Sequence, residues 1–509
     1  MVVHSSTQHP TEVQHKVAHA LHLAMSAVRV EVRRMGGGFG GKESQGNALA
    51  IACAVVAHRL GRPARMRYDR DDDMVITGKR HDLRIMYRAG VDDEGRILGL
   101  EFTHLFRCGW SQDLSLPVAD RAMLHADNCY HLPNIRIESH RLKTNTQSAT
   151  AFRGFGGPQG MVGIERIMDH VAFATGRDPL EVRKLNFYRP AGSKPVQTTP
   201  YHMPVEDFIA QDLVAELERT SDYAARKAAV AEWNRQSPIL KRGIALTPVK
   251  FGISFTLTWL NQAGALVHVY QDGSVALNHG GTEMGQGLFQ KVAQVTASVF
   301  GLDAGMVKIT ATDTAKVPNT SATAASSGSD LNGMAAKAAA ETIRARLAEF
   351  IAEKHQVKPS TVKFADGTVR VAGEVYPWDK VVAWAYQARV SLSSTGFYAT
   401  PKIVWDRVRG TGRPFFYFAY GAAVTEVVID RLTGENRILR ADLLHDTGTS
   451  LNPALDIGQV EGAYVQGAGW LTTEELVWDS KGRLMTHAPS TYNIPACSDR
   501  PPIFNVALW

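Results

Sequence analysis

The chain of 509 residues is longer than one hydrophobic core supports, so we expect two or more domains. Apolar residues make up 44% of the sequence and charged residues 21%, which excludes a disordered chain. The formal charge of +6 is small for this length and suits an anionic ligand or cofactor. The sequence lacks a basic stripe with interleaved aromatic residues, so it gives no indication of a nucleic-acid partner.

The sequence shows no signal peptide, no membrane-spanning segment and no cysteine motif. The start, MVVHSSTQHP, lacks the cationic and apolar blocks of a signal peptide, and the longest apolar run, 48–57, has about half the length that spanning a bilayer needs. We therefore expect a cytoplasmic protein that has no membrane partner. The four cysteines are widely separated, which excludes a self-contained iron–sulfur or zinc-finger motif and fits a reducing compartment: Cys53, Cys108, Cys129 and Cys497.

The first segment of the chain alternates between strand, loop and helix patterns. Valines alternate with charged residues over 28–33, which predicts a half-buried strand. A glycine run over 36–41 follows, and an apolar stretch over 47–60 predicts a helix that ends at Gly61. We expect another strand over 64–68.

The middle of the chain is polar and helical over 204–237, between flanking prolines. We interpret 201–240 as a helical connector between a first region, 1–200, and a second region, 241–509. In the second region a hairpin over 267–277 closes at Asp272-Gly273.

Loops of small residues precede helices in the second region. The loop 279–287 leads into a helix from Leu288, and the loop 319–330 leads into a helix over 331–356 that is rich in Ala and Glu. A second hairpin turns at Thr433-Gly434. These patterns predict an α+β fold with mixed sheets and helices.

The sequence MGGGFGGKE over 35–43 fits two nucleotide-binding templates. Its glycines match G-x-G-x-x-G, and the same stretch matches most of a phosphate-binding P-loop. The P-loop interpretation fails at Glu43, where a hydroxyl group should reach magnesium, and Asp69 matches the acidic residue of a dinucleotide fold only loosely. This segment alone leaves open a nucleotide loop, another anion loop and a tight turn.

A second aromatic–glycine loop, RGFGGP over 153–158, repeats the GFGG core. A nucleotide fold needs one such loop, whereas several imply a large anionic ligand that is held mainly by backbone N–H groups. The loops 279–287 and 319–330 and a small polar turn at 456–459 are interpreted as further walls of the same site.

Together these loops resemble the molybdenum hydroxylase family, and within it the molybdenum-binding part of the xanthine dehydrogenases. The resemblance runs through nearly the whole chain and rests on blocks in family order: GGGFGGKE, DRDDDMVITGKRH, DLSLPVADRA, HADNCY, TAFRGFGGPQ, KFGISFT, NQAGALVHVY, HGGTEMGQGL, TAAS, SLNPALDIGQVEGAYVQG and PSTYNIPA. It implies an elongated two-domain architecture in which the regions 1–200 and 241–509 bind molybdopterin and hold it between them.

The resemblance also implies which residues surround the cofactor. In this family the pterin itself holds molybdenum, and Gln8 matches a glutamine near an oxo ligand of the metal. The alternative for Gln8 is a solvated polar residue near a terminus. The other implied residues enclose the pterin largely through backbone groups: Phe39, Gly40, Arg153, Met284, Gly285, Gln286, Ser326 and Gln459.

Two charged residues match the purine-recognition residues of the family, Glu43 and Arg121. A charge in an apolar pocket costs several kcal/mol unless it is paired. A purine offers ring N–H donors to a carboxylate and carbonyl oxygens to a guanidinium, which could stabilise charge on the purine in the transition state. The alternatives are a surface ion pair of Arg121 with Asp120 and a first-turn helix charge for Glu43.

Aromatic and small residues complete the implied substrate site. Phe155 and Phe255 match two phenylalanines that sandwich the heterocycle, although a lone phenylalanine is more often part of a core. Ala324 and Ala325 match a close wall over the substrate. The charged pair favours purines over aldehydes, and the loop 153–155 lacks the cysteine that carbon monoxide dehydrogenases place there.

The implied reaction is the oxidative hydroxylation of hypoxanthine and xanthine to urate with oxygen derived from water. We expect 2Fe-2S and FAD groups on other domains or subunits, NAD as the electron acceptor, and a homodimer of heterodimers. The family's glutamate base lies in a V-G-E-P-P block beyond Trp509. We therefore expect no general base within the chain, a C-terminally incomplete second region and an inactive isolated chain.

The sequence leaves three other interpretations open. They are an aldehyde oxidase-like molybdenum hydroxylase, a non-catalytic fragment, and a nucleotide-binding enzyme that uses GGGFGGK as a P-loop.

Overall fold

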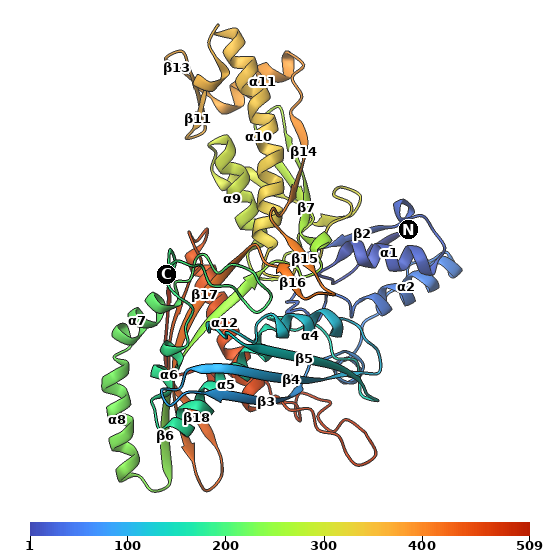
Figure 1. Cartoon of the computed structure of the whole chain (residues 1–509). Helices are drawn as coiled ribbons and strands as arrows, with labels where there is room; N and C mark the ends of the chain where they lie inside the picture. Colours follow the sequence, from blue (N-terminus) through green and yellow to red (C-terminus); the bar gives the residue numbers. More distant parts are fainter. The chain divides into compact units, whose positions relative to one another are not determined.

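The computed structural model describes residues 1–509 and divides into two compact units, each built from two separate stretches of chain (Figure 1). Unit 1 comprises Met1–Arg67 and Leu257–Lys402. Unit 2 comprises Tyr68–Thr256 and Ile403–Trp509.

The first stretch of unit 1 packs two helices against a three-stranded sheet. Its elements are β1 (Val2–His4), α1 (Pro10–Ala20), β2 (Arg29–Val32) and α2 (Asn47–Leu60), and β10 (Thr312–Asp313) joins them from the second stretch. The central strand β2 pairs in parallel with β1 and antiparallel with β10. The core consists of valines and alanines from α1, α2 and the strand region: Val13, Val17, Ala18, Val28, Val30, Val32, Ala50 and Ala54.

The second stretch of unit 1 packs a long helix against a sheet. Its elements are β7 (Gln262–Val269), β8 (Val275–His279), α9 (Leu288–Phe300), β9 (Val307–Ile309), α10 (Gly328–Lys354), β11 (Lys363–Ala365), β12 (Thr368–Val371), β13 (Glu374–Pro377), α11 (Trp378–Gln387) and β14 (Ser393–Ala399). The main sheet has the order β14-β7-β8-β9, and α10 runs along β14 and β7 beside α9 (Figure 1). The strands β11, β12 and β13 form a separate sheet.

Unit 2 contains two larger sheets that share an apolar core, and a two-stranded sheet of β15 and β16. Its elements are α3 (Arg70–Ile76), β3 (Leu83–Val91), β4 (Ile97–Gly109), α4 (Ser115–Met123), β5 (Ile135–Lys143), α5 (Gly157–Thr175), α6 (Pro179–Leu185), α7 (Ala210–Thr220), α8 (Tyr223–Gln236), β6 (Leu240–Ile253), β15 (Val404–Asp406), β16 (Thr411–Arg413), β17 (Tyr417–Asp430), β18 (Asn436–His445), α12 (Pro453–Thr472) and β19 (Ile503–Leu508). Residues of both larger sheets, β3-β4-β5 and β19-β18-β17-β6, contribute to one buried cluster.

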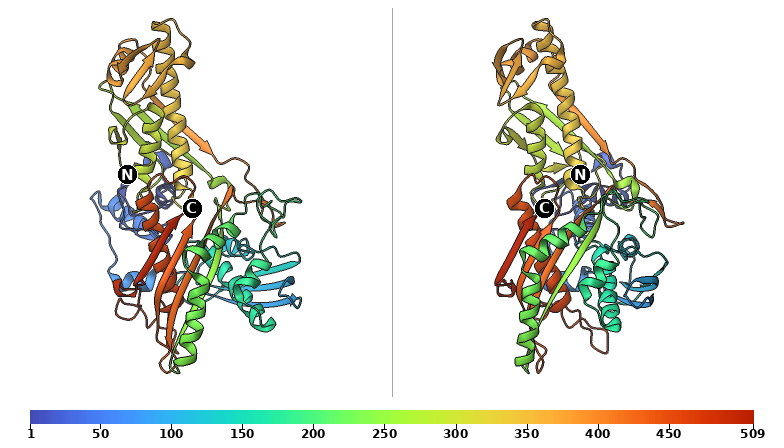
Figure 2. Two further views of the ribbon diagram at one scale, coloured as in Figure 1. Left: turned by 90° about the vertical axis from the view of Figure 1, so that its left-hand side faces the viewer. Right: turned by 60° about the vertical axis from the view of Figure 1, so that its left-hand side comes forward.

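Helices cover both sheets of unit 2. The helices α4 and α5 pack on each other and against the sheet of β3, β4 and β5. In the other sheet α7 contacts β6 and β17, and α8 runs along β6 (Figure 2). The segment 201–240 thus contains two helices, as its polar helical pattern predicts. The division of the chain into 1–200, 201–240 and 241–509 stays a prediction.

Several local predictions are confirmed. The helix predicted over 47–60 is α2, and Gly61 ends it in the left-handed conformation with φ 62°. The hairpin that turns at Asp272-Gly273 is formed by β7 and β8, and the one that turns at Thr433-Gly434 by β17 and β18. The helix α9 begins at Leu288 as predicted.

Two local predictions are wrong. The segment 64–68 is not a strand but an irregular connection to α3, and no other strand pairs with it. The residues 456–459 do not form a turn but belong to α12, whose N-cap Asn452 accepts a hydrogen bond from the Leu455 amide at 3.2 Å. None of the helices combines the length and apolar character that crossing a membrane requires.

Candidate functional site

Gln8 joins two of the predicted loops of unit 1. Its side chain is 3% exposed, so the solvated alternative is wrong. The amide oxygen Oε1 accepts a hydrogen bond from the Gly40 N–H at 3.0 Å, and Nε2 donates to the Thr323 carbonyl oxygen at 3.0 Å. The Gln8 backbone bonds to Lys42 and Thr323 as well, each at 2.9 Å. One residue thus fixes the glycine loop 36–43 against the loop 319–327.

Gly38 shows how closely the glycine loop approaches these neighbours. A Cβ atom at this position would lie 2.7 Å from Gln8 Oε1 and 2.9 Å from Met284 Sδ. Such a contact is shorter than a van der Waals separation, so a side chain at this position would displace Gln8 or Met284. The structure therefore brings Gln8, Met284 and the glycine loop together, as the resemblance implies.

The loop 279–287 is organised by an acidic residue that the sequence analysis did not single out, Glu283. Its carboxylate accepts hydrogen bonds from the amides of Gly285 at 2.8 Å, Gly287 at 3.1 Å and Phe289 at 2.9 Å. Its position just before α9 is a recognisable helix-start signal, because carboxylates stabilise N-terminal amides.

Gln286 folds back onto this same loop. Its Oε1 accepts a hydrogen bond from the Met284 N–H at 2.7 Å, and its Nε2 donates to the Thr282 carbonyl oxygen at 3.0 Å. The Thr282 amide in turn donates to Thr323 Oγ1 at 2.8 Å. The loops at 36–43, 279–287 and 319–327 are therefore one hydrogen-bonded assembly within unit 1.

Strained backbone marks the same loops. Phe39, Ala325 and Ser326 have φ values of 54°, 57° and 56°, in the left-handed region that residues with a side chain rarely adopt. Such conformations cost about 1–3 kcal/mol each and cluster at ligand-binding sites. Ser326 leads directly into α10, whose N-cap Ser327 makes no side-chain capping bond. The positive end of a 27-residue helix thus begins at this loop, which favours an anion there.

Glu43 lies at the end of the glycine loop. It is 7% exposed, and its backbone N–H donates to the Gly40 carbonyl oxygen at 3.1 Å. The helix α2 begins only at Asn47, so the alternative of a first-turn helix charge is wrong. Ala324 follows Thr323, and the Ala324 carbonyl oxygen accepts the Ser327 N–H at 3.3 Å. The predicted substrate residues of unit 1 are thus attached to the loops that Gln8 joins.

The nucleotide-binding interpretation of this segment is contradicted. The strand β2 pairs with β1 and β10, and no strand follows α2 to make a parallel strand–helix–strand unit. The helix α2 also begins several residues beyond the last glycine of the run, so its N-terminal amides are not part of the glycine loop.

Arg121 is a buried cation of unit 2, 2% exposed near the end of α4. Its Nη1 donates to the Ser254 carbonyl oxygen at 3.1 Å and its Nη2 to the Gly252 carbonyl oxygen. The rings of Phe251 and Phe415 lie 4.9 and 5.2 Å from the guanidinium carbon, within cation–π range.

The alternative role of Arg121 as a surface partner of Asp120 is wrong. Asp120 forms its ion pairs with Arg141 and with Arg407, the latter at 2.5 Å. Arg121 instead donates to backbone carbonyl oxygens at the end of β6, in Gly252, and just beyond it, in Ser254, so its position depends on that strand.

The loop 153–158 packs tightly on α4. Phe155, with φ 51°, contacts the apolar cluster that includes Val118 and Ala122. A Cβ atom on Gly156 would lie 2.0 Å from the Val118 carbonyl oxygen. Phe255, which follows Ser254 in the chain, is 7% exposed. Phe155 and Phe255 are therefore both attached to the surroundings of Arg121, whereas their predicted sandwich of a heterocycle stays a prediction.

Arg153 and Gln459 contact each other, whereas their predicted binding of the cofactor stays a prediction. Arg153 Nη2 donates to the Gln459 carbonyl oxygen at 2.9 Å and lies 3.3 Å from Gln459 Oε1. Both line a cavity of about 370 Å³ that also includes Val249, His445 and Tyr464. Burial lowers the pKa of Arg153.

A half-buried arginine, Arg80, supports this pair and was not predicted from the sequence. Arg80 Nη2 donates to the Arg153 carbonyl oxygen at 2.8 Å, and its guanidinium carbon lies 4.3 Å from the Phe152 ring and 4.8 Å from the Trp470 ring. Burial lowers the pKa of Arg80 to about 10. Its position within the DRDDDMVITGKRH block was the available signal.

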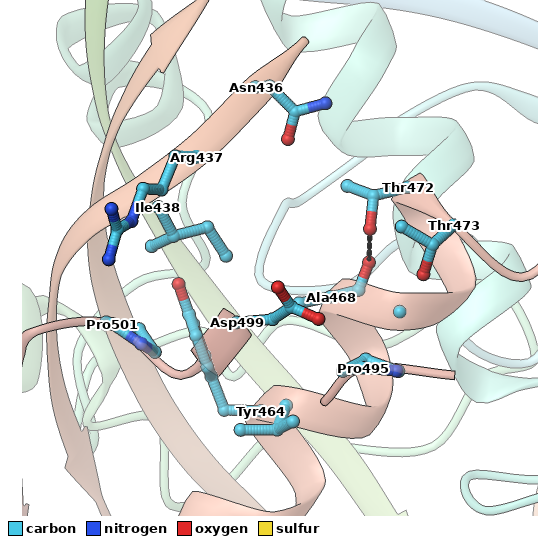
Figure 3. Close-up of a pocket in the computed structure, with 12 residues that line it drawn as sticks. Asn436, Arg437, Ile438, Tyr464, Ala468, Thr472, Thr473, Pro495, Asp499 and Pro501 are labelled. Carbon is cyan, nitrogen blue, oxygen red and sulfur yellow. Dashed lines mark hydrogen bonds between the residues drawn. The ribbon is translucent and has the colours of Figure 1, made fainter. Parts of the chain in front are cut away.

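A further cavity of about 80 Å³ lies between α12 and β18 (Figure 3). Tyr464, Ala468 and Thr472 of α12 line one wall, and Asn436 and Ile438 of β18 line another. None of the predicted site residues lines this cavity. The structure also contains no group of three or more His, Cys, Asp and Glu side chains that could hold a metal ion.

Sequence comparison relates the chain to known proteins. Two profiles of a molybdopterin cofactor-binding domain match residues 1–187 and 216–501. The chain is 46% identical over 503 residues to the xanthine dehydrogenase/oxidase of Rattus norvegicus, and 44% identical over 504 residues to the xanthine dehydrogenase of Drosophila subobscura. Each alignment covers 99% of this chain and 36% of the relative, so the chain spans about a third of the length of these curated relatives.

Comparison of folds agrees with the predicted architecture. The structure of quinoline 2-oxidoreductase from Pseudomonas putida 86 matches with a TM-score of 0.88 at 24% identity, over 100% of this chain and 65% of that one. A Cu,Mo-CO dehydrogenase matches with a TM-score of 0.87 at 20% identity, over the same shares. The predicted α+β architecture of a molybdopterin-binding fold is confirmed.

Proposed function

The chain belongs to the molybdopterin cofactor-binding domain family, and from this premise we propose that it is the molybdenum-binding part of a xanthine dehydrogenase. One observation carries the proposal furthest. Glu43 and Arg121, the two charged residues expected to recognise a purine, are both buried, Glu43 at the end of the glycine loop and Arg121 against the carbonyl oxygens of Gly252 and Ser254.

The residues of unit 1 fit the cofactor. Hydrogen bonds join the glycine loop, the loop 279–287 and the loop before α10 into one assembly. The positive end of α10 begins at this assembly, and its N-cap Ser327 makes no side-chain capping bond. Loops of small residues at a helix N-terminus suit an anionic pterin. In unit 2 we assign Arg153 and Gln459 to the same cofactor.

The substrate residues have distinct expected roles. When bound, the molybdenum cofactor supplies the redox chemistry that introduces water-derived oxygen into a purine carbon. Glu43 would accept a hydrogen bond from a purine ring N–H, and Arg121 would stabilise charge on a purine carbonyl oxygen. Phe155 and Phe255 would hold the heterocycle, and Ala324 and Ala325 would limit the space above it.

The remaining parts of the reaction belong to the same proposal. Hypoxanthine and xanthine are oxidised to urate, and electrons pass to 2Fe-2S and FAD groups on other domains or subunits and then to NAD. The enzyme is cytoplasmic and assembles as a homodimer of heterodimers.

The test is to purify the complete enzyme that contains this chain and to measure bound molybdenum, bound pterin and urate formation. Stoichiometric molybdenum and sustained xanthine oxidation are expected. A molybdenum-loaded enzyme that oxidises aromatic aldehydes but no purine would make it an aldehyde oxidase. A preparation that binds neither molybdenum nor pterin would overturn the proposal as a whole.

A further inference from the structure

The strand β6 lies at the edge of its four-stranded sheet, and side chains from the segment 121–128 bind along it. Asn128 Nδ2 donates to the Pro248 carbonyl oxygen at 2.9 Å, and Asn128 Oδ1 accepts the Lys250 N–H at 2.9 Å. Farther along the strand, His125 Nε2 accepts the Gly252 N–H at 3.0 Å. This segment therefore occupies part of the place that a further strand would take.

His125 has a defined protonation state in this arrangement. Because Nε2 accepts a hydrogen bond, the ring hydrogen is on Nδ1, which donates to the carbonyl oxygen of Arg121 at 2.9 Å. The ring is 1% exposed and packs against Phe251 and Phe415, with ring centroids at 4.9 and 5.2 Å. Burial and the nearby Arg121 charge hold the pKa of His125 well below its ordinary value, so the ring is neutral.

Gly252 is held from both sides. His125 binds its N–H, while its carbonyl oxygen accepts the guanidinium of Arg121. A Cβ atom on Gly252 would lie 2.3 Å from the Phe415 ring, so the peptide has no room to shift in that direction. The side chain and the backbone of Arg121 are thus connected through one neutral imidazole and one glycine.

We propose that His125 is a positioning residue for Arg121, which sets where the guanidinium points without contacting the substrate. The inference rests on the proposed purine-recognition role of Arg121. Without the hydrogen bond from its N–H to His125, Gly252 would be more mobile, and its carbonyl oxygen would no longer hold the Arg121 guanidinium in one orientation. Misplacement of a recognition group by about 1 Å can cost on the order of 100-fold in rate.

The test compares His125→Phe with His125→Gln in the complete holoenzyme. The phenylalanine keeps the ring and its packing but loses both hydrogen bonds, whereas the glutamine can still accept the Gly252 N–H. We expect H125F to lower kcat/KM for xanthine by about 10- to 100-fold with molybdenum content unchanged, and H125Q to restore much of it. Oxidation of an aromatic aldehyde is expected to change little. Equal losses with both substrates, or no rescue by H125Q, would overturn the inference.

A double-mutant cycle identifies the route of the effect. If His125 acts through Arg121, H125F should cause no further loss of xanthine turnover once Arg121→Met is present. An additive loss would show that His125 acts by another route and would overturn the proposal.

Crystal structures of both variants supply a readout that is independent of turnover. The Arg121 guanidinium should be displaced in H125F and retained in H125Q, and an unmoved guanidinium in H125F would contradict the inference. If the unaltered holoenzyme oxidised no purine, the proposed function would fail, while these structures would still decide whether His125 positions Arg121.

Discussion

Glu43 lies among the backbone amides of the glycine loop, yet its proposed contact is with the substrate. Glu43→Val should therefore lower kcat/KM for xanthine by about 5- to 150-fold, the loss of one hydrogen bond to a charged group, because a purine N–H loses its acceptor. Steady-state urate formation measures this change.

Molybdenum content is the control for this variant. It should stay near normal in Glu43→Val, because Glu43 is not expected to hold the cofactor. If molybdenum and activity fell in parallel, Glu43 would be a cofactor residue and the substrate assignment would be wrong.

Arg121 has a structural role, in its hydrogen bonds to Ser254 and Gly252, and a proposed role in purine recognition. One substitution, Arg121→Met, is expected to affect both in different measurements. In Arg121→Met the carbonyl oxygens of Ser254 and Gly252 lose their donors, which should cost about 1–3 kcal/mol of stability for each buried group left unsatisfied. Purine oxidation should fall further than aromatic aldehyde oxidation, since an aldehyde lacks the second carbonyl oxygen that the guanidinium stabilises.

The rates with xanthine and with an aromatic aldehyde, measured beside thermal unfolding, check the Arg121 prediction. Arg121→Lys is the matched variant, because lysine keeps the charge but not the two-pronged geometry. Equal loss of both activities in Arg121→Met would mean a purely structural role.

At the residue scale the sequence predicted loops that the structure joins, but not the contacts that support them. Gln8, Met284 and the glycine loop were identified by motif, and the structure joins them. Glu283 and Arg80 were missed because they act through other residues, Glu283 on loop amides and Arg80 on the Arg153 carbonyl oxygen. Such support depends on contacts between distant parts of the chain, which no local pattern records.

At the scale of elements, the contact between α4 and α5 depends on glycine. A Cβ atom on Gly160 of α5 would lie 2.2 Å from the carbonyl oxygen of Ala122 in α4. Gly160→Ala should therefore force the helices apart and destabilise the chain by roughly 1–3 kcal/mol or more. Urea unfolding of the protein measures the difference.

Gly462 of α12 supplies the matched control for Gly160. It is also an interior helical glycine, but nothing lies within 4 Å of the position that its Cβ would take. Gly462→Ala should be neutral or stabilise by about 0.5–1 kcal/mol, because alanine has the higher helix propensity. Equal stability of the two variants would show that the close helix contact is not required.

Elements with local start and stop signals were predictable, and elements made by distant pairing were not. The helix α2 has an apolar run and a glycine cap, and both hairpins have a glycine in the turn. By contrast β10 is two residues long and exists because it pairs with β2. The expected strand over 64–68 failed for the opposite reason, since its pattern had no partner.

At the scale of the whole molecule, buried histidines link stability to pH. Burial lowers the pKa of His81, His104 and His279 from 6.5 to about 4. Between these values the unfolded chain binds more protons than the folded chain, so folding stability rises with pH. The free energy of unfolding should be highest above about pH 6.5 and should decrease as the pH falls toward 4, by up to roughly 3 kcal/mol for each histidine. Urea unfolding across this pH range checks the slope.

His104 allows the source of this slope to be tested. Neither of its ring nitrogens has a hydrogen-bond partner, and the rings of Phe102 and Phe106 flank it at 5.3 and 6.2 Å. His104→Phe should therefore keep the packing and make the stability less dependent on pH between about 4 and 6.5. A slope identical to that of the unaltered protein would exclude His104 as a contributor.

The interleaving of the two units affects how the chain can reach its native state. The sheet of β1 and β2 is completed by β10, and the whole stretch Tyr68–Thr256 of unit 2 lies between them in sequence. Contacts of such high sequence separation form slowly, because loop-closure entropy must be overcome first. During synthesis the 1–67 segment leaves the ribosome long before β10 is made. Until then the edge of β2 that pairs with β10 is open to other chains. The pairing of β10 with β2 is therefore expected to form later than the local contacts of the 1–67 segment, which stays exposed to aggregation until then.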